Sequence, residues 1–184
     1  MITVVGVGTS ELPEAARVRL AGAALLVGSA RQLALAQRAA APLGERRTFE
    51  LGGDLATALG VIAASSGPVV VLASGDPGFF GIVRVLAEEF GRRNLEVIPA
   101  VSAVAVAFAK AGLPWDDALV VSAHGRDPGP AINACLAHPK VAVLTAPGFG
   151  PAELAAVLRG HRRRLLVAER LGEPDERVVE GDPA

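Results

Sequence analysis

The chain has 184 residues, of which 51% are hydrophobic and 20% charged, and its formal net charge is −1. This balance argues against nucleic-acid binding driven by bulk charge, and six Phe and one Trp leave few rings on which bases could stack. The single cysteine, Cys135, excludes an internal disulfide and a cysteine-based metal cluster, and we expect a buried, unreactive thiol. No apolar run approaches the roughly 20 residues of a membrane span. The N-terminus lacks the pattern of a signal peptide, so we expect a soluble cytoplasmic protein.

The first half of the sequence alternates between strand-like and helix-like segments. Short apolar runs that end in glycine or proline predict strands, and residues such as Ser29 and Asp54 are suited to cap the helices that follow. The predicted strands are residues 2–7, 25–27, 47–51, 69–72 and 96–98, and the predicted helices include residues 30–41, 54–65 and 82–90. This alternation indicates an α/β fold with a parallel sheet.

The second half predicts a smaller α/β lobe. It follows a helix at residues 102–111 made almost entirely of small residues, which would let another backbone or a ligand come close. Strands are predicted at residues 118–122, 141–144, 165–168 and 177–180, and helices at residues 131–137 and 151–160. The second lobe is short for an independent domain. We therefore expect two lobes, residues 1–113 and 114–184, that pack together and leave a cleft.

A glycine-rich loop follows the predicted strand at residues 69–72. Gly75, Pro77 and Gly78 force a tight turn and would let the backbone approach a ligand. Ligands of open α/β sheets bind beyond the carboxyl ends of the strands, which is where this loop lies. The alternative is a plain strand-to-helix turn. The first strand also ends in glycines, Gly6 and Gly8, but position 11 lacks the third glycine of a dinucleotide site, and the sequence contains no P-loop.

Five motifs in order resemble the tetrapyrrole (precorrin) methylase family over essentially the whole chain. They are GVGT at residues 6–9, SGDPGF at 74–79, PAVSA at 99–103, LPWDD at 113–117 and SAHGR at 122–126. The last two are most similar to the branch that methylates C5 of a late precorrin, either cobalt-precorrin-7 or precorrin-6B, in cobalamin biosynthesis. The same module forms the N-terminal half of bifunctional C5,15-methyltransferases.

The resemblance implies two α/β lobes with S-adenosylmethionine in the cleft between them, and a homodimeric C-methyltransferase that needs no metal. The implied cofactor contacts are Gly8, Thr9, Ser74, Gly75, Asp76, Phe79, Ser102, Ala103 and Thr145. Many relatives have proline where this chain has Thr9 and glycine where it has Ser10. Relatives also continue with a further strand, so we expect the second lobe to be truncated at its end. A C15-methyltransferase and decarboxylase, fused or separate, is the implied partner.

Methyl transfer from an activated sulfonium mainly requires alignment of the nucleophile. If a proton must move, His124 is the first candidate, but the expected role of this histidine is to orient its loop. Arg126 is a candidate to bind carboxylates of the substrate, and the run at residues 162–164 could do so or be a solvated loop end. The alternatives are a tetrapyrrole methylase acting on a different ring carbon and a non-catalytic protein that binds a corrinoid or a nucleotide.

Overall fold

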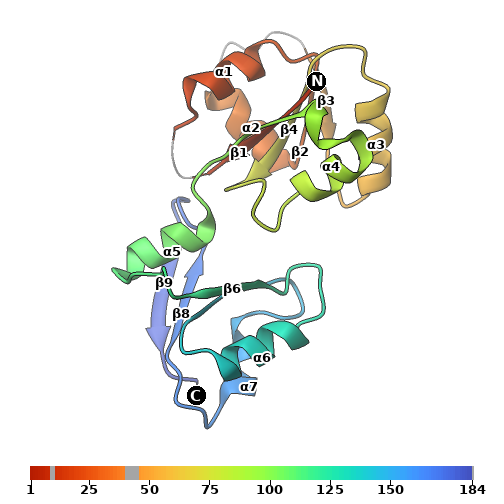
Figure 1. The fold of residues 1–184 in the computed structure, drawn as a ribbon. Helices are drawn as coiled ribbons and strands as arrows, with labels where there is room; N and C mark the ends of the chain where they lie inside the picture. Colours follow the sequence, from red (N-terminus) through yellow and green to blue (C-terminus); the bar gives the residue numbers. More distant parts are fainter. Residues whose placement is uncertain (9–10, 40–45, 184) are drawn as a thin grey trace. The chain divides into compact units, whose positions relative to one another are not determined.

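The computed structural model describes residues 1–8, 11–39 and 46–183 of the chain (Figure 1). It has the mixed α/β fold with a parallel sheet that the sequence predicts, and it divides into two compact units, Met1–Ser102 and Ala103–Ala184. The division falls at the start of helix α5 (Ala103–Ala111), whereas the predicted boundary falls after it. The division into lobes 1–113 and 114–184, which places this helix in the first lobe, stays a prediction. Within the described ranges no helix is both long and apolar enough to cross a membrane.

The first unit is built on a five-stranded sheet in which every pairing is parallel. In spatial order its strands are β3 (Arg47–Glu50), β2 (Leu25–Gly28), β4 (Val69–Ser74), β1 (Ile2–Val7) and β5 (Leu95–Ile98). Its helices are α1 (Glu14–Ala21), α2 (Ala30–Ala39), α3 (Leu55–Ala63) and α4 (Val83–Phe90), and a short 3-10 turn, η1 (Arg92–Asn94), precedes β5. All five predicted strands of this half are present.

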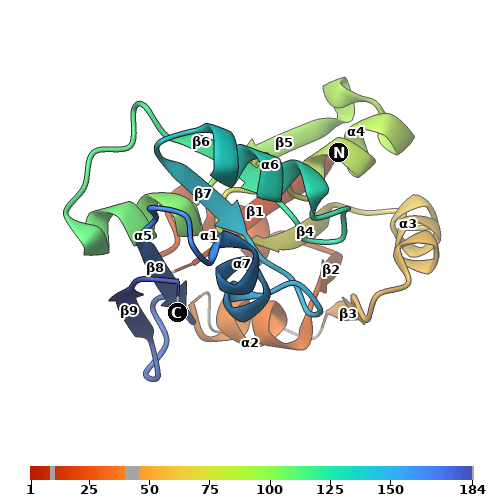
Figure 2. The same cartoon turned by 90° about the horizontal axis from the view of Figure 1, so that it is seen from below.

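Helices cover both faces of this sheet, as seen from two directions in Figures 1 and 2. On β1, Val5 and Val7 pack with residues of α1 and α2, whereas Ile2 and Val4 pack with residues of α3 and α4. Alternate side chains of a strand point to opposite faces, so a strand covered on both sides is expected to be largely apolar. This explains the apolar sequences of β1 and β4, whose hydrophobic residues are all buried and whose polar residues are Thr3 and Ser74.

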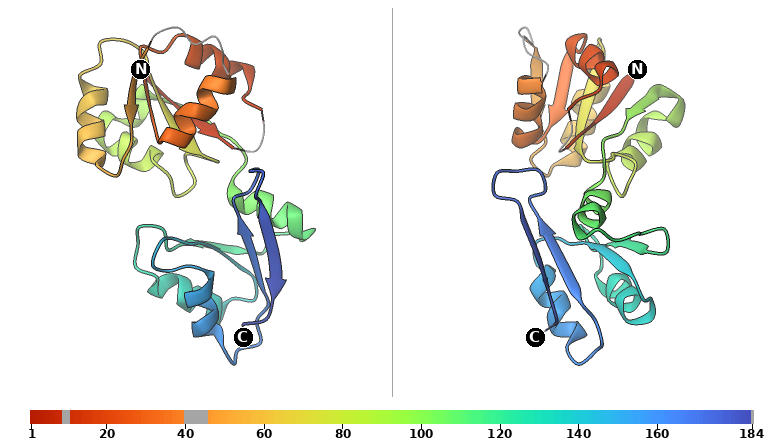
Figure 3. Two further views of the ribbon diagram at one scale, coloured as in Figure 1. Left: turned by 180° about the vertical axis from the view of Figure 1, so that it is seen from behind. Right: turned by 90° about the vertical axis from the view of Figure 1, so that its left-hand side faces the viewer.

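The second unit contains two separate two-stranded sheets (Figure 3). Strands β6 (Leu119–Ser122) and β7 (Val141–Leu144) pair in parallel, and β8 (Leu165–Glu169) and β9 (Arg177–Gly181) form an antiparallel pair. Helices α6 (Gly129–Ala137) and α7 (Pro151–Leu158) provide Cys135, Leu154 and Leu158 to the core of this unit. Cys135 is buried as expected, and burial raises the pKa of its thiol, which keeps it protonated.

One polar link fastens the edge of the first sheet. The hydroxyl of Thr3, a buried polar side chain of β1, donates to Glu96 of β5 at 3.0 Å. Arg19 of α1 binds the same carboxylate through two nitrogens, at 2.6 and 2.9 Å. The Arg19 hydrogen bond is the main cause of a lowered pKa of Glu96. The three residues therefore join a helix and two strands.

We predict that Glu96→Gln lowers the melting temperature by about 2 °C at pH 7, a small effect because the ion pair is partly exposed. A lowered folded-state pKa stabilises the fold above the ordinary value of 4.5 and loses its effect as the carboxylate becomes protonated. The difference from the wild type should therefore shrink as the pH falls below that value. Thermal unfolding between pH 7 and pH 3 measures it. Exposed Glu89→Gln is the control, and an equal loss there would contradict the assignment.

Candidate functional site

The carboxyl ends of β4, β1 and β5 lie side by side, and the loops that follow them are joined by backbone hydrogen bonds. The amide of Gly75 donates to the carbonyl of Val7 at 2.8 Å, and the amide of Ala100 donates to the carbonyl of Gly75 at 3.3 Å. Gly75 is thus bound on both sides, and its φ of +62° lies in a region that favours glycine. The glycine-rich loop is held by its two neighbours at the edge where α/β sheets bind ligands.

Gly6 allows these loops to come together. A Cβ at this position would lie 2.2 Å from the carbonyl oxygen of Gly75 and 2.5 Å from the amide nitrogen of Ala100, so no side chain fits. At Gly8 the nearest described atoms would be 3.8 Å from a Cβ, which is ordinary contact. The sequence pointed to Gly8 as the contact residue and missed Gly6. A glycine inside a buried strand was the available signal, because such a glycine often marks a close backbone approach.

The loop after β4 is ordered by its own aspartate. Asp76 accepts a hydrogen bond from the amide of Gly78 at 2.8 Å through its carboxylate, and from the amide of Phe79 at 3.1 Å through its carbonyl. Phe80 has a φ of 56°, which is strained for a bulky residue, and its ring meets that of Phe79 edge to face with centroids 5.0 Å apart. Asp76 therefore shapes this loop from within.

Ser74 ends β4 with an exposed side chain, and α2 reaches it from the side. Gln32 in the first turn of α2 donates from Nε2 to the Ser74 hydroxyl at 3.1 Å. The other atom of the same amide, Oε1, accepts from the backbone of Ser29 at 2.8 Å, and Ser29 in turn accepts from the amide of Gln32 at 3.4 Å. Ser29 and Gln32 form a reciprocal N-terminal cap. The sequence predicted Ser29 as the cap, but nothing in it indicated the contact with Ser74.

In the second unit, His124 and Thr145 lie at neighbouring strand ends. The ring nitrogen Nδ1 of His124 is 3.3 Å from the carbonyl oxygen of Thr145, and the backbone amide of His124 donates to the Ser122 hydroxyl at 3.2 Å. A carbonyl oxygen only accepts, so a hydrogen bond there requires the proton on Nδ1 and leaves Nε2 as the outward nitrogen. The backbone of Arg126, two residues on, donates to the carbonyl of Ala123 at 3.3 Å.

The predicted contact residues therefore fall into two groups, each described within its own unit. The first group lies in the first unit, in the loops after its strands, and includes the last residue of that unit. Its members are Gly8, Ser74, Gly75, Asp76, Phe79 and Ser102. Those in the second unit are Ala103, His124, Arg126 and Thr145. Thr9 lies outside the described residues. Contact of any of them with a cofactor or substrate stays a prediction.

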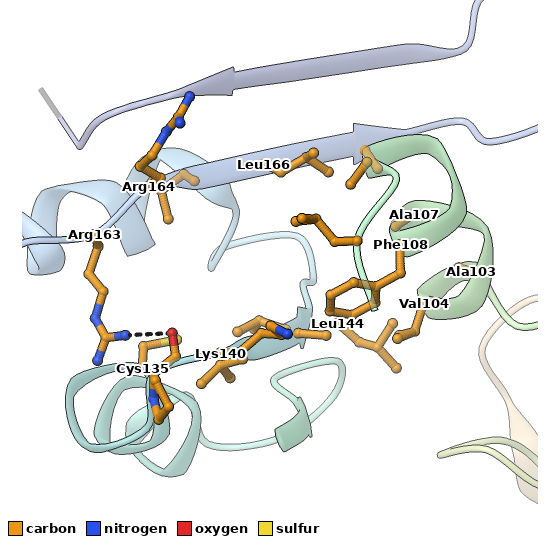
Figure 4. A pocket seen from close by; sticks show the side chains of 18 of the residues that line it. Ala103, Val104, Ala107, Phe108, Cys135, Lys140, Leu144, Arg163, Arg164 and Leu166 are labelled. Carbon is orange, nitrogen blue, oxygen red and sulfur yellow. Dashed lines mark hydrogen bonds between the residues drawn. The ribbon is translucent and has the colours of Figure 1, made fainter. Parts of the chain in front are cut away.

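A cavity of about 450 Å³ lies inside the second unit (Figure 4). It is bordered by helix α5 and by strands β7 and β8, and Ala103 is the one predicted cofactor contact among the residues that line it. Consecutive residues of β7 line it, although alternate side chains of a strand point to opposite faces. The cavity therefore opens along the edge of β7, and it is a different feature from the converging loops of the first unit.

The arginine run at residues 162–164 borders the same cavity, and two of its members are bound within the unit. Arg163 donates to the carbonyls of Pro139 at 3.1 Å and Leu136 at 3.2 Å, and Arg164 pairs with Glu180 at 2.9 Å. These contacts favour a structural role for the run over binding of substrate carboxylates. Within the described ranges, no group of three or more His, Cys, Asp or Glu side chains is placed to hold a metal ion.

Comparison with known proteins identifies the family. Residues 1–183 match the family described as Tetrapyrrole (Corrin/Porphyrin) Methylases. The chain belongs to this family. It is a methyltransferase, and its fold is that of the tetrapyrrole methylases.

The most informative relatives are two curated proteins and one solved structure. Over 97% of its length the chain is 39% identical to cobalt-precorrin-7 C(5)-methyltransferase from Salmonella typhimurium, of which it covers 89%. Over 97% it is also 36% identical to precorrin-6Y C(5,15)-methyltransferase [decarboxylating] from a Sinorhizobium species, of which it covers 44%. A uroporphyrin-III C-methyltransferase from Thermus thermophilus, solved with S-adenosyl homocysteine, is 25% identical and superimposes with a TM-score of 0.69, covering 99% of this chain and 83% of that one.

We predict that Gly6→Ala lowers the melting temperature by about 5 °C or more, because its Cβ would displace the backbone of Gly75. Gly8→Ala is the matched control, and its melting temperature should stay within about 2 °C of the wild type. Differential scanning calorimetry of both variants measures the effect. Equal stability of the two variants would show that the loops do not depend on the close approach at Gly6.

Proposed function

We propose that this tetrapyrrole methylase transfers a methyl group from S-adenosylmethionine to C5 of a late precorrin in cobalamin biosynthesis. The observation that carries the proposal is the 39% identity, over nearly the whole chain, to an enzyme named cobalt-precorrin-7 C(5)-methyltransferase. The relative named for both C5 and C15 matches this chain over 44% of its own length. Both relatives are named for methylation at C5, and both match this chain over 97% of its length.

The loops of the first unit suit S-adenosylmethionine. Gly6 and Gly75 let the backbone of the strand ends pack closely, and glycine at these positions keeps side chains away from the place where a ligand would approach. Ser74 and Asp76 add a hydroxyl and a carboxylate within three residues, and the related uroporphyrin-III enzyme was solved with S-adenosyl homocysteine. When bound, the sulfonium supplies an already activated methyl group. Ser74, Gly75, Asp76 and Phe79 would hold it from this loop, with Gly8, Thr9, Ser102, Ala103 and Thr145 completing the proposed set.

The chain's own part in the reaction is then chiefly alignment. Holding two reactants in register can supply about 7–11 kcal/mol of a barrier without acid–base help. Asp76 orders the loop that would grip the cofactor, because its carboxylate binds the amide of Gly78. The Nδ1 of His124 faces the carbonyl of Thr145, which fixes the ring within its loop, and a loop-orienting role is the one we propose for it. Arg126 remains the proposed contact for a substrate carboxylate.

The proposal extends to partners and location. A homodimer in the cytoplasm is our proposal, as is a separate or fused C15-methyltransferase and decarboxylase acting on the product. The Sinorhizobium relative, whose name includes both activities, supports the last point. The rival functions are methylation of a different ring carbon and binding of a corrinoid or nucleotide without catalysis. Transfer of a methyl group to any tetrapyrrole would exclude the non-catalytic binding function. The position of the new methyl group shows whether C5 or a different ring carbon is methylated.

We predict that the chain, incubated with a late precorrin and S-adenosylmethionine, adds one methyl group at C5 and releases no carbon dioxide. Mass spectrometry counts the methyl groups and detects any decarboxylation, and isotope-edited NMR with a ¹³C-labelled donor locates the carbon. A Gly75→Val variant is the control, because its backbone φ strains a branched side chain and the loop should no longer support transfer. Loss of carbon dioxide, or a methyl group elsewhere, would contradict the proposal.

We also predict that Asp76→Ala slows methyl transfer more than His124→Ala does. Removal of a loop-orienting histidine should cost about 10-fold, whereas loss of a general base should cost about 10²–10⁴-fold. Single-turnover assays with both variants at saturating cofactor compare the two losses. A larger loss at His124 than at Asp76 would make His124 the proton-transfer residue and reverse these roles.

A further inference from the structure

The amide of Gln32 has a defined orientation. Its contact with the backbone amide of Ser29 must be made by oxygen, since a backbone N–H only donates. The other end is therefore the NH₂ group, which can only donate. The Ser74 hydroxyl, 3.1 Å away, must accept this hydrogen bond. The proton of the Ser74 hydroxyl is consequently not used in the contact with Gln32.

This arrangement leaves the Ser74 hydroxyl as a donor. Among the described residues, the contact with Gln32 is the one hydrogen bond found for this side chain, which is exposed at the end of β4. Ser74 is followed directly by Gly75, which β1 and the loop after β5 hold in place. The hydroxyl proton is thus available at the carboxyl edge of the sheet, beside the loop that we propose to bind S-adenosylmethionine.

Residues at the end of β2 and the start of α2 position the Gln32 side chain beside Ser74. Gly28 ends β2 and lies under the glutamine side chain, where a Cβ would be 3.2 Å from Oε1 of Gln32 and 3.0 Å from the Cβ of Leu72. The cap with Ser29 holds the first turn of α2, so the glutamine has little freedom. The helix cap uses only Oε1 of the Gln32 amide. The Nε2 group is not needed for the cap, and it donates to Ser74 at the end of β4.

We propose that Gln32 is a positioning residue that fixes the Ser74 hydroxyl as a hydrogen-bond donor to an acceptor atom of bound S-adenosylmethionine or its demethylated product. The inference rests on the proposed function, because it requires that these loops bind this cofactor. It adds a residue from α2 to the proposed contacts at the ends of β1, β4 and β5. Gln32 itself acts through Ser74 and does not touch the cofactor.

The decisive variant is Gln32→Glu. A carboxylate oxygen still accepts from the amide of Ser29, so the cap and the melting temperature should be kept, within about 2 °C. The other carboxylate oxygen can only accept, so the Ser74 hydroxyl turns its proton toward position 32 and loses it for the ligand. Isothermal titration with S-adenosyl homocysteine should show about 10-fold weaker binding. Gln37→Glu, at an exposed position of the same helix, is the control for added charge and should bind like the wild type.

A double-mutant cycle separates positioning from simple repulsion. Ser74→Ala should also weaken binding about 10-fold, and adding Gln32→Glu to it should cause no further loss, because the hydroxyl is already gone. Additive losses, or unchanged binding by Gln32→Glu alone, would overturn the inference while leaving the proposed function intact. If the wild-type chain does not bind S-adenosyl homocysteine, the proposed function fails first, and the role of Gln32 fails with it.

Discussion

The candidate site of the first unit depends on the close approach of the ends of β1, β4 and β5. The carbonyl oxygen of Gly75 lies 2.2 Å from the position that a Cβ of Gly6 would take, and that carbonyl also accepts a hydrogen bond from the amide of Ala100. Backbone groups of three segments, far apart in sequence, thus satisfy one another in a space from which side chains are excluded. The consequence is an edge whose backbone is held by its own hydrogen bonds and which carries polar side chains such as Ser74 and Asp76. Such an edge is suited to a ligand that must be held in one orientation.

The pattern of apolar residues explains why the fold could be predicted so closely. β1 and β4 are covered by helices on both faces, so their sequences are continuous apolar runs, and the glycines and capping residues that follow mark where each strand and helix ends. Asp54 illustrates the point, because it caps α3 through the amide of Thr57 as its sequence context predicts. Among the described residues, element ends moved by only a few residues, since frayed helix ends leave little trace in sequence. The end predicted at residue 41 lies outside the described residues.

What the sequence could not reveal depends on contacts between distant segments. Gln32 looks like an ordinary residue of a helix, and its tie to Ser74 exists only because β2 and β4 are neighbours in the sheet. Gly6 was visible as a glycine, but its partners come from two other loops. Likewise, the arginine run gave no sign that Arg163 would donate to the carbonyls of Leu136, in the last turn of α6, and Pro139, just before β7. Local pattern predicts elements, whereas tertiary pairing decides which side chains meet.

The two units also differ in how far their strands are paired and buried. Strands β1 and β4 are paired on both sides and buried, whereas β6, β7 and β8 are only partly buried, and β7 and β8 border a cavity instead of each other. Several polar groups help to order each unit: Asp76 binds within its own loop, the Nδ1 of His124 faces the carbonyl of Thr145, and Arg164 pairs with Glu180. Methyl transfer is compatible with such structural roles, because the donor is already activated and the protein need only hold both reactants in line.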